Sequence, residues 1–278
     1  MRDGVRPVLF LSDFGASEYP GICRAVIASI APEVPVIDLS HHVPPFDVAA
    51  GALVAMDAAP YAPPGSVWLA VVDPGVGGGR RAVVVLAARG DLLVGPDNGL
   101  LMAAAAALGG VKGAWSLENP AYRLPGLSST FHGRDLFAPA AAHLAKGLPP
   151  EAMGPPVEPE SLLPAPLPEP RLEKAPEPRL IATVILFDPF GSARLRAPAR
   201  LLGDLGLAPG RPARLAAGGR SWRLPVARTF GDVPEGAALL LEDSSGDILV
   251  AVHRGSARRE LGLQRGQEVE IAPLRGGV

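Results

Sequence analysis

An aspartate and an arginine stand seven positions apart in the segment VVDPGVGGGRR, residues 71–81. Asp73 follows an apolar run, and Arg80 closes a glycine-rich stretch. A histidine, His132, lies in a second segment, SSTFHGRDLFAPAAAHLAKG at 128–147, just before an expected helix that ends at its last glycine. A carboxylate, a fixed cation and a titratable imidazole can together position a water molecule and deprotonate it. These three residues are the candidate catalytic groups, against the simpler alternative that His132 only caps or packs on its helix.

The glycines between Asp73 and Arg80 raise the alternative of a phosphate-binding loop. The dinucleotide fingerprint GxGxxG needs a strand before it and a helix after it, so that phosphate meets free N–H groups at the helix end. Gly75 and Gly77 match its start, but Arg80 stands at the third glycine position and the β-branched run AVVVLAA follows at 82–88. No Gly-Lys-Ser/Thr follows, which excludes a P-loop. The segment is predicted to join two strands.

Carboxylates follow three of the apolar runs. Asp13 comes after the run at 8–12, Asp38 after the run at 34–37, and Asp73 after the run that precedes it. Ligands of open α/β sheets bind at the carboxyl ends of the strands, so carboxylates gathered there favour a polyhydroxylated or cationic ligand. The alternative for each aspartate is that it caps the following helix.

Apolar runs alternate with helix-like segments in the first half of the chain. This alternation predicts an α/β domain with a mostly parallel sheet over residues 1–150. The segment GPDNG at 95–99 is expected to be a tight turn that supports the sheet edge. The expected strands lie at 7–11, 35–39 and 66–73, and the expected helices near 19–31 and 47–59.

A segment dense in Pro and Glu, residues 151–178, is expected to be an extended linker, because Pro supplies no ladder or helix donor. After it, short strand-like runs such as LIATVILF and DILVAVH predict a smaller, mostly β, barrel-like domain over 179–278. A faint echo between 204–215 and 260–271 repeats a short turn before a strand, as small barrels often do.

Composition restricts the function classes. The chain has 278 residues, a formal net charge of −2 and one cysteine. This charge carries no bias towards nucleic acid or acidic membranes, and the single Cys23 excludes an intramolecular disulfide. The N-terminal apolar run is too short for a signal sequence, so a cytoplasmic protein is expected. A metal-dependent hydrolase that uses His41, His42, His132 and the Asp residues as ligands is a weaker alternative, because these histidines lack i, i+4 or HxH spacing.

The same motifs resemble those of a known family. In order along the chain they are similar to the motifs of the S-adenosyl-L-methionine hydroxide adenosyltransferases, also called S-adenosyl-L-methionine hydrolases, which are relatives of the bacterial fluorinase and chlorinase. The resemblance covers nearly the whole chain. The motifs are LSDFG (11–15), VIDLSHHVPPFDV (36–48), VVDPGVGGGRR (71–81), VGPDNGLL (94–101), STFHGRDLFAPAAAHLAKG (129–147), FDPFGS (187–192) and EDSSGDILVAVHRGSA (242–257).

The resemblance implies an enzyme that converts S-adenosyl-L-methionine (SAM) and water to adenosine and L-methionine, by attack at the ribose C5′ and without a cofactor or a metal. It implies an α/β domain followed by a β-barrel, and homotrimers whose sites lie between neighbouring subunits. Asp73, Arg80 and His132 fall on the family's catalytic triad. Asp13 would bind the ribose hydroxyls, and Phe46 would pack on the ligand.

In the second domain the resemblance places Asp188 against the methionine amino group. Ser192 stands where the family usually has Asn, so a hydroxyl replaces an amide with two donors and one acceptor. Family spacing alone selects Arg80 over its neighbour Arg81. The residues that would enclose the methionine or adenine ends are Phe190, Phe230, Ser244, Ser245 and Arg254.

Two other functions stay open at this point. A halide-dependent 5′-halogenase would use another nucleophile at the same carbon, but halide-using relatives lack the Asp, Arg and His set. A SAM- or adenosine-binding sensor would use the same pocket without turnover, and the complete triad argues against it.

Overall fold

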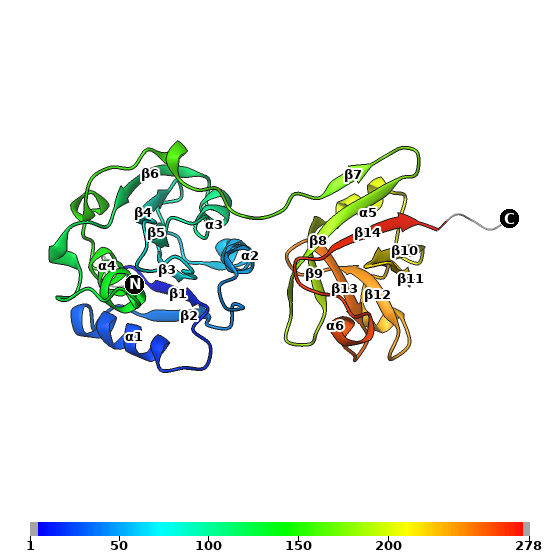
Figure 1. Cartoon of the computed structure of the whole chain (residues 1–278), viewed down its shortest axis with the longest axis horizontal. Coiled ribbons are helices and arrows are strands. Elements are labelled where there is room, and N and C mark those ends of the chain that lie inside the picture. Colours follow the sequence, from blue (N-terminus) through cyan, green and yellow to red (C-terminus); the bar gives the residue numbers. More distant parts are fainter. Residues whose placement is uncertain (1–4, 275–278) are drawn as a thin grey trace. The chain divides into compact units, whose positions relative to one another are not determined.

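A computed structural model describes residues 5–274 of the chain. The chain divides into two compact units between Pro166 and Leu167 (Figure 1). Within the described range, no helix has the length and apolar character needed to cross a membrane.

The N-terminal unit is built on a six-stranded sheet in which β4 runs antiparallel to both of its neighbours and the other five strands share one direction. The sheet is mixed, which corrects the expectation of a mostly parallel one. The cause is the short turn at 88–91, because two strands joined by a hairpin turn must run antiparallel. In spatial order the strands are β2 (Val36–Ser40), β1 (Val8–Ser12), β3 (Val67–Val71), β5 (Leu92–Pro96), β4 (Ala82–Ala87) and β6 (Val111–Ser116).

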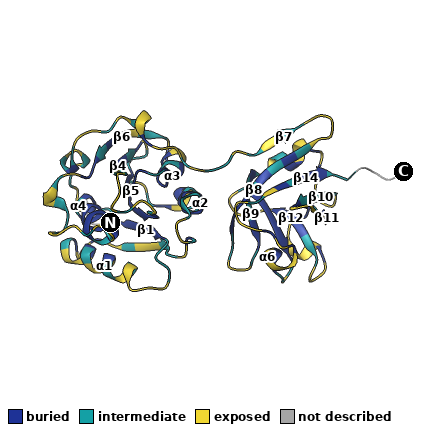
Figure 2. Ribbon diagram, in the orientation of Figure 1, coloured by how far each residue is buried: buried dark blue, intermediate teal, exposed yellow. Residues whose placement is uncertain are grey.

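Helices cover the sheet, and its central strands are buried throughout (Figure 2). The helix α1 (Tyr19–Ile30) contacts α4 (Ala138–Ala145), and the helix α2 (Val48–Ala58) contacts α3 (Met102–Ala107). Asp47 starts α2, because its side chain accepts a hydrogen bond from the Ala50 amide at 2.9 Å. Short 3₁₀ turns lie at Ala59–Tyr61, Pro120–Tyr122, Pro150–Met153 and Pro159–Ser161, and a π-helical turn at Gly133–Phe137 leads into α4.

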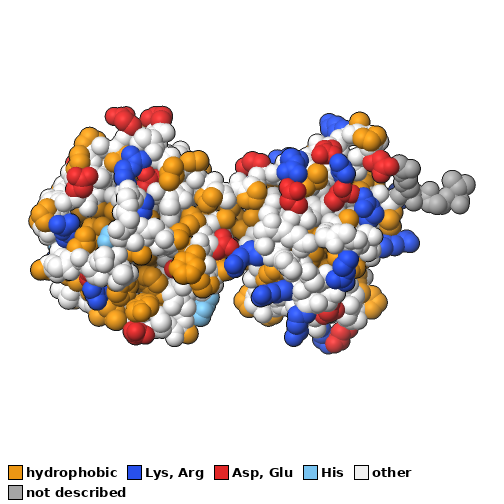
Figure 3. Space-filling view, in the orientation of Figure 1, with side chains coloured by type: hydrophobic (Ala, Val, Ile, Leu, Met, Phe, Trp, Pro, Cys, Tyr) orange, Lys and Arg blue, Asp and Glu red, His pale blue; other side chains and the backbone are white. Residues whose placement is uncertain are grey.

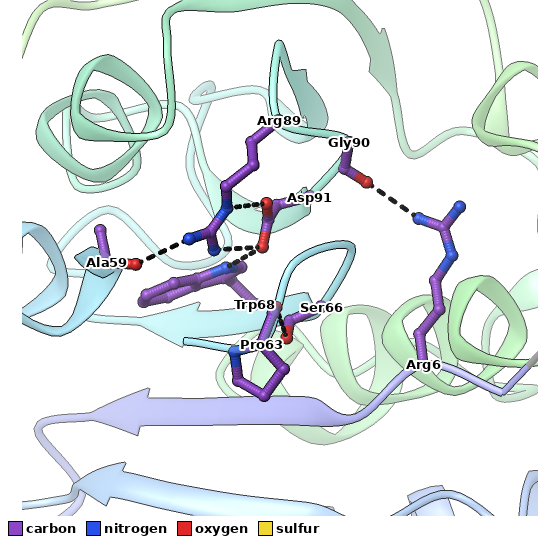
Figure 4. Close-up of polar contacts among 8 residues, drawn as sticks. All are labelled: Arg6, Ala59, Pro63, Ser66, Trp68, Arg89, Gly90 and Asp91. Carbon is purple, nitrogen blue, oxygen red and sulfur yellow. Dashed lines mark hydrogen bonds and ion pairs between the residues drawn. The ribbon is translucent and has the colours of Figure 1, made fainter. Parts of the chain in front are cut away.

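A buried ion pair ties together the amino ends of β3 and β5 (Figure 4). Asp91 is fully buried and binds the Arg89 guanidinium through both carboxylate oxygens, at 2.8 and 2.9 Å. The Trp68 indole N–H donates to the same carboxylate at 3.2 Å, and Arg89 also donates to the Ala59 carbonyl at 3.0 Å. These donors compensate the burial of the Asp91 charge, at the end of the sheet opposite Asp73.

The C-terminal unit is a mostly β, barrel-like domain, as predicted. All the strand pairs are antiparallel, and a bridge between Val226 and Leu240 links the β11 and β12 ends of the sheet so that it nearly closes. The two similar segments, 204–215 and 260–271, end in β10 and β14, and these two strands pair with each other. The elements are β7 (Arg171–Glu173), β8 (Arg179–Phe187), β9 (Ala193–Pro198), α5 (Arg200–Asp204), β10 (Pro212–Ala217), β11 (Arg220–Pro225), a 3₁₀ turn (Phe230–Asp232), β12 (Ala238–Glu242), β13 (Asp247–Val252), α6 (Ala257–Glu260) and β14 (Glu268–Pro273).

The Pro-rich segment is shared between the two units. Its first part packs on the N-terminal unit, where the Val157 amide donates to the Ala114 carbonyl at 2.8 Å and Leu162 is buried. Its last part forms β7, which pairs with β8. The surfaces of the units differ: on the face seen in Figure 3, the N-terminal unit carries hydrophobic patches among few charges, and the C-terminal unit carries interspersed acidic and basic side chains.

Candidate active site

Loops at the carboxyl ends of β1, β2 and β3 meet the start of the π-helical turn and enclose a cavity of about 480 Å³. This is the edge of the sheet at which open α/β folds bind ligands. Four of the predicted residues line the cavity, namely Asp13, Phe46, Asp73 and His132. The complete lining is Asp13, Phe14, Tyr19, Pro45, Phe46, Val71, Asp73, Val76, Ser128, Thr130, Phe131, His132, Gly133 and Arg134.

Arg80 joins the other two predicted catalytic groups. Its Nε lies 3.0 and 3.1 Å from the two carboxylate oxygens of Asp73, and its Nη2 also donates to Oδ2. The same Nη2 lies 2.8 Å from Nδ1 of His132. The guanidinium carbon stacks over the Phe137 ring at 5.2 Å from its centre. The three side chains therefore form one connected and nearly buried group, with side-chain exposures of 5 % for Asp73 and 12 % for Arg80.

The contact with Arg80 fixes the tautomer of His132. A guanidinium only donates hydrogen bonds, so Nδ1 of His132 must accept, and the neutral ring carries its proton on Nε2. Burial and the adjacent Arg80 charge hold the pKa of His132 below its ordinary value. The imidazole is thus a neutral hydrogen-bond donor at the pocket wall.

The glycine-rich loop brings Arg80 and His132 together through close backbone contact. Gly77 has a φ of +74°, and a Cβ added there would collide with the Ser129 carbonyl oxygen. Only glycine meets both requirements without strain. The loop joins β3 to β4, which confirms the prediction of a strand–loop–strand segment.

The two ends of this loop are tied to the turn after β5. The Asn98 amide donates to the Val72 carbonyl at 2.9 Å, immediately before Asp73, and Arg81 Nε donates to Asp97 at 2.8 Å. The expected tight turn at 95–99 therefore supports the loop that carries Asp73 and Arg80. Arg81 is held outside the triad by this pair, so Arg80 is the arginine that faces Asp73 and His132.

Asp13 and Phe46 lie on neighbouring loops and contact each other. The Phe46 amide donates to Asp13 Oδ2 at 2.9 Å, and Phe46 adopts a φ of +66° with 73 % of its surface exposed. Burial raises the pKa of Asp13, with a smaller contribution from the Asp73 charge, while the Phe46 amide opposes the rise. Asp38, the third strand-end aspartate, lies within β2, pairs with Arg24 and does not line the cavity.

Sequence reasoning missed the aromatic wall of this cavity. Phe14, Tyr19 and Phe131 contact one another edge to face, with ring centres 4.9 to 5.9 Å apart. Arg134 lies over Phe131 at 5.1 Å and pairs with Asp135. Phe14 and Phe131 belong to the LSDFG and STFHGRD motifs, so their position beside Asp13 and His132 was the available signal.

A second cavity, of about 510 Å³, lies in the C-terminal unit. Four predicted residues line it, namely Phe190, Ser192, Phe230 and Arg254, together with Val252, His253, Gly255 and Arg259. Asp188 lies beside it, and its Oδ1 accepts hydrogen bonds from the Phe190 and Ser192 amides at 2.9 and 2.8 Å.

Two predicted residues of the C-terminal unit do not join this cavity. Ser244 and Ser245 are exposed in the turn between β12 and β13, at the opposite end of β13 from Arg254. The turn is held by Asp243, whose Oδ1 accepts hydrogen bonds from the Ser245 and Asp247 amides at 2.8 and 3.0 Å. Among residues 5–274, no three His, Cys, Asp or Glu side chains come together as a metal site.

The fold and the sites define a class: a two-unit protein with a small-molecule cavity at the carboxyl edge of an α/β sheet and a second cavity on a β-barrel. The family profile of the SAM hydroxide adenosyltransferase N-terminal domain matches residues 8–154, and that of the C-terminal domain matches residues 182–270. The chain belongs to the SAM hydroxide adenosyltransferase family.

Individual relatives agree with this assignment. The (R)-S-adenosyl-L-methionine hydrolase of Thermus thermophilus is 47% identical, over 96% of this chain and 100% of its own length, and that of Salinispora tropica is 45% identical over 95% and 97%. The fluorinase of Nocardia brasiliensis is 27% identical over 97% of this chain and 98% of its own. An uncharacterized conserved protein of Thermotoga maritima has a TM-score of 0.88 at 36% identity, covering 95% of this chain and 99% of its own.

The backbone requirement at Gly77 can be tested against a neighbouring glycine. Gly77→Ala should lower the free energy of unfolding by about 2 kcal/mol, because it combines a left-handed backbone with a collision. Gly79→Ala is the matched control, since Gly79 has open space around it and no positive φ. Urea unfolding of both variants measures the difference, and equal stabilities would contradict the close loop contact.

The electrostatic coupling of Arg80 to His132 can be measured by NMR titration of the histidine rings. The pKa of His132 should lie below 6.5 and rise in Arg80→Met, because the substitution removes a neighbouring positive charge and leaves Asp73 unpaired. His143, whose pKa is also lowered by burial, should titrate unchanged in the variant and serves as the control. An unchanged pKa of His132 in Arg80→Met would refute the contact.

Proposed function

We propose that this protein hydrolyses SAM to adenosine and L-methionine, by attack of water-derived hydroxide on the ribose C5′. The observation that carries the proposal is the connected Asp73–Arg80–His132 group at the wall of the N-terminal cavity. The names of the relatives that are 45–47% identical over nearly the whole chain support the same reaction.

The substrate needs a nucleophile more than it needs an acid. A sulfonium leaves as a neutral thioether, so its departure requires no proton. The electron pair of hydroxide forms the new C5′–O bond while the C5′–S pair departs with sulfur, and one proton is released from water. Charge is dispersed as hydroxide meets the sulfonium, so a cavity with little bulk water favours the reaction.

The hydrogen bonds of the three side chains give each of them a different role in the reaction. His132 carries its proton on Nε2 and donates it as a hydrogen bond to the nucleophilic oxygen, which fixes the direction of attack. Asp73 keeps acceptor positions beyond those that Arg80 occupies, so it takes the proton of water. Arg80 supplies the positive charge that favours hydroxide over water and keeps the other two groups in place.

Substrate binding uses both cavities. Asp13, a carboxylate at the wall of the N-terminal cavity, accepts hydrogen bonds from the ribose hydroxyls, and the exposed Phe46 ring packs on the ligand. In the C-terminal unit, Asp188 binds the methionine amino group, and Phe190, Phe230 and Arg254 enclose the other end of the ligand. Ser192 offers a single hydroxyl there, and Ser244 and Ser245 have no place in that cavity.

We further propose that the active protein is a homotrimer, in which the N-terminal cavity of one subunit is completed by the C-terminal cavity of the next. Both cavities carry aromatic rings that are largely exposed, 73 % for Phe46 and 80 % for Phe190. Exposed aromatic side chains at a cavity are typical of surfaces that another chain or a ligand covers. The reaction needs no metal, because the leaving group is already activated and Arg80 favours the nucleophile.

The catalytic assignment predicts a specific kinetic pattern. Arg80→Ala and His132→Ala should each lower kcat about 100-fold or more while KM changes only a few-fold, because their contacts act on the nucleophile and not on the bound substrate. The assay follows adenosine formation from SAM by chromatography, with chelator-treated protein. Arg81→Ala is the matched control and should lower kcat less than about tenfold, since its pair with Asp97 supports the loop from outside the cavity and its loss leaves the Asp73, Arg80 and His132 side chains in place. A rise in KM alone would assign Arg80 and His132 to binding.

The trimer is tested by light scattering of the purified protein. The expected mass is three times that of the 28.6 kDa chain. A stable monomer with full activity would contradict a site shared between subunits.

A further inference from the structure

The loops that carry Asp13 and Phe46 are joined by contacts that lie outside the cavity. Ser12, the last residue of β1, is fully buried, and its Oγ lies 2.8 Å from Nδ1 of His41 on the next loop. The Phe14 amide donates to the same hydroxyl oxygen at 3.3 Å. Ser12 therefore links two segments. One is the backbone at Phe14, which directly follows Asp13, and the other is the loop after β2, which leads to Phe46.

His41 makes three further contacts, one with the loop after β1, one with β1 and one with β2. Its backbone carbonyl accepts a hydrogen bond from the Gly15 amide at 2.6 Å. Its ring packs edge-on against Phe10, with ring centres 4.6 Å apart. Its Nε2 lies 3.3 Å from Asp38 Oδ1, in a carboxylate that also pairs with Arg24 at 2.8 Å.

The Ser12 hydroxyl has partners on two different segments. Its Oγ shares a hydrogen bond with Nδ1 of His41 at 2.8 Å and accepts one from the Phe14 amide at 3.3 Å. This one hydroxyl thus joins the loop after β1 to the loop after β2.

The order Ser, His, Asp is that of a hydrolase triad, but this group is placed for another purpose. Ser12 has no exposed surface, and neither it nor His41 lines the N-terminal cavity. A nucleophile must reach its substrate. The group instead lies beside Asp13, which is flanked in the chain by Ser12 and Phe14 and accepts a hydrogen bond from the Phe46 amide.

We propose that His41 is a positioning residue, which through Ser12 clasps the loop after β1 to the loop after β2 and so holds Asp13 and Phe46 in substrate-binding position. This inference rests on the proposed function for its kinetic consequence. Because Asp13 and Phe46 bind the substrate and do not touch the nucleophile, loss of the clasp changes KM more than kcat.

The test compares the steady-state kinetics of three variants with those of the wild type and of two controls. His41→Leu keeps a bulky side chain against Phe10 but removes the hydrogen bond, and Ser12→Ala removes the other partner. Each should raise KM for SAM about tenfold, as expected for the loss of a hydrogen bond that holds a binding group, with kcat within about threefold. The double variant should be no worse than either single one, because both remove the same contact.

Two substitutions serve as controls. His41→Asn keeps a hydrogen-bonding group near the position of Nδ1, because an amide can either donate or accept, and should restore KM to within about threefold of the wild type. His42→Leu changes the neighbouring histidine, which is exposed and whose side chain makes no hydrogen bond in the described structure, and should leave KM unchanged. A purely structural role for His41 would lower the melting temperature without this pattern in KM.

Hydrogen exchange separates the clasp from the proposed reaction. In Ser12→Ala, which removes a single oxygen atom, the amides of residues 13–15 and 46–48 should lose protection while those of β3 keep it. Unchanged KM and unchanged protection in Ser12→Ala and His41→Leu would overturn the clasp. Failure of the wild-type protein to form adenosine from SAM would overturn the proposed function, and the exchange measurement would still decide the clasp.

Discussion

The contact of one guanidinium with a carboxylate and an imidazole determines what the rest of the structure must provide. Arg80 neutralises Asp73 and at the same time imposes the Nε2–H tautomer on His132. Each of these groups would be costly to bury alone, and together their hydrogen bonds compensate that cost. The chain must therefore bring two distant segments, residues 73–80 and 132, to within hydrogen-bond distance of each other.

The α/β sheet meets this requirement at its carboxyl edge. Asp73 leaves β3 and Arg80 precedes β4, so the loop returns on itself, and its ends are fixed by Asn98 and Asp97 of the next turn. Gly77 lets this loop touch the backbone that presents His132. The hydrogen bond between Ser12 and His41 connects the loops after β1 and β2 in a similar way, so the two sides of the cavity depend on separate sets of contacts.

Local pattern and family motifs predicted much of this arrangement. The β-branched run after Arg81 predicts the strand–loop–strand segment, and the resemblance to the family motifs predicts the group of Asp73, Arg80 and His132 that the structure brings together. The sequence pattern does not predict that β4 runs antiparallel to its neighbours. The apolar pattern of a strand does not indicate its direction in the sheet, and here the short turn at 88–91 determines that direction. Asp38 is expected at the end of a strand but lies within the edge strand β2. The sequence does not distinguish these two positions, because an aspartate is tolerated in both.

The remaining differences come from tertiary contacts that sequence spacing does not encode. The motif that holds Ser244 and Ser245 also holds Arg254, but an extended strand separates them, so only Arg254 reaches the cavity. His41 was considered only as a metal ligand, whereas its contacts with Ser12 and Gly15 depend on the pairing of β1 with β2.

The source of the oxygen in the product tests the central claim most directly. Purified protein is incubated with SAM in ¹⁸O-labelled water, and the adenosine is analysed by mass spectrometry with fragmentation of the ribose. The account predicts adenosine with solvent oxygen at C5′ and methionine without it. Adenosine without the label, or no adenosine at all, would contradict attack of water-derived hydroxide at the site of Asp73, Arg80 and His132.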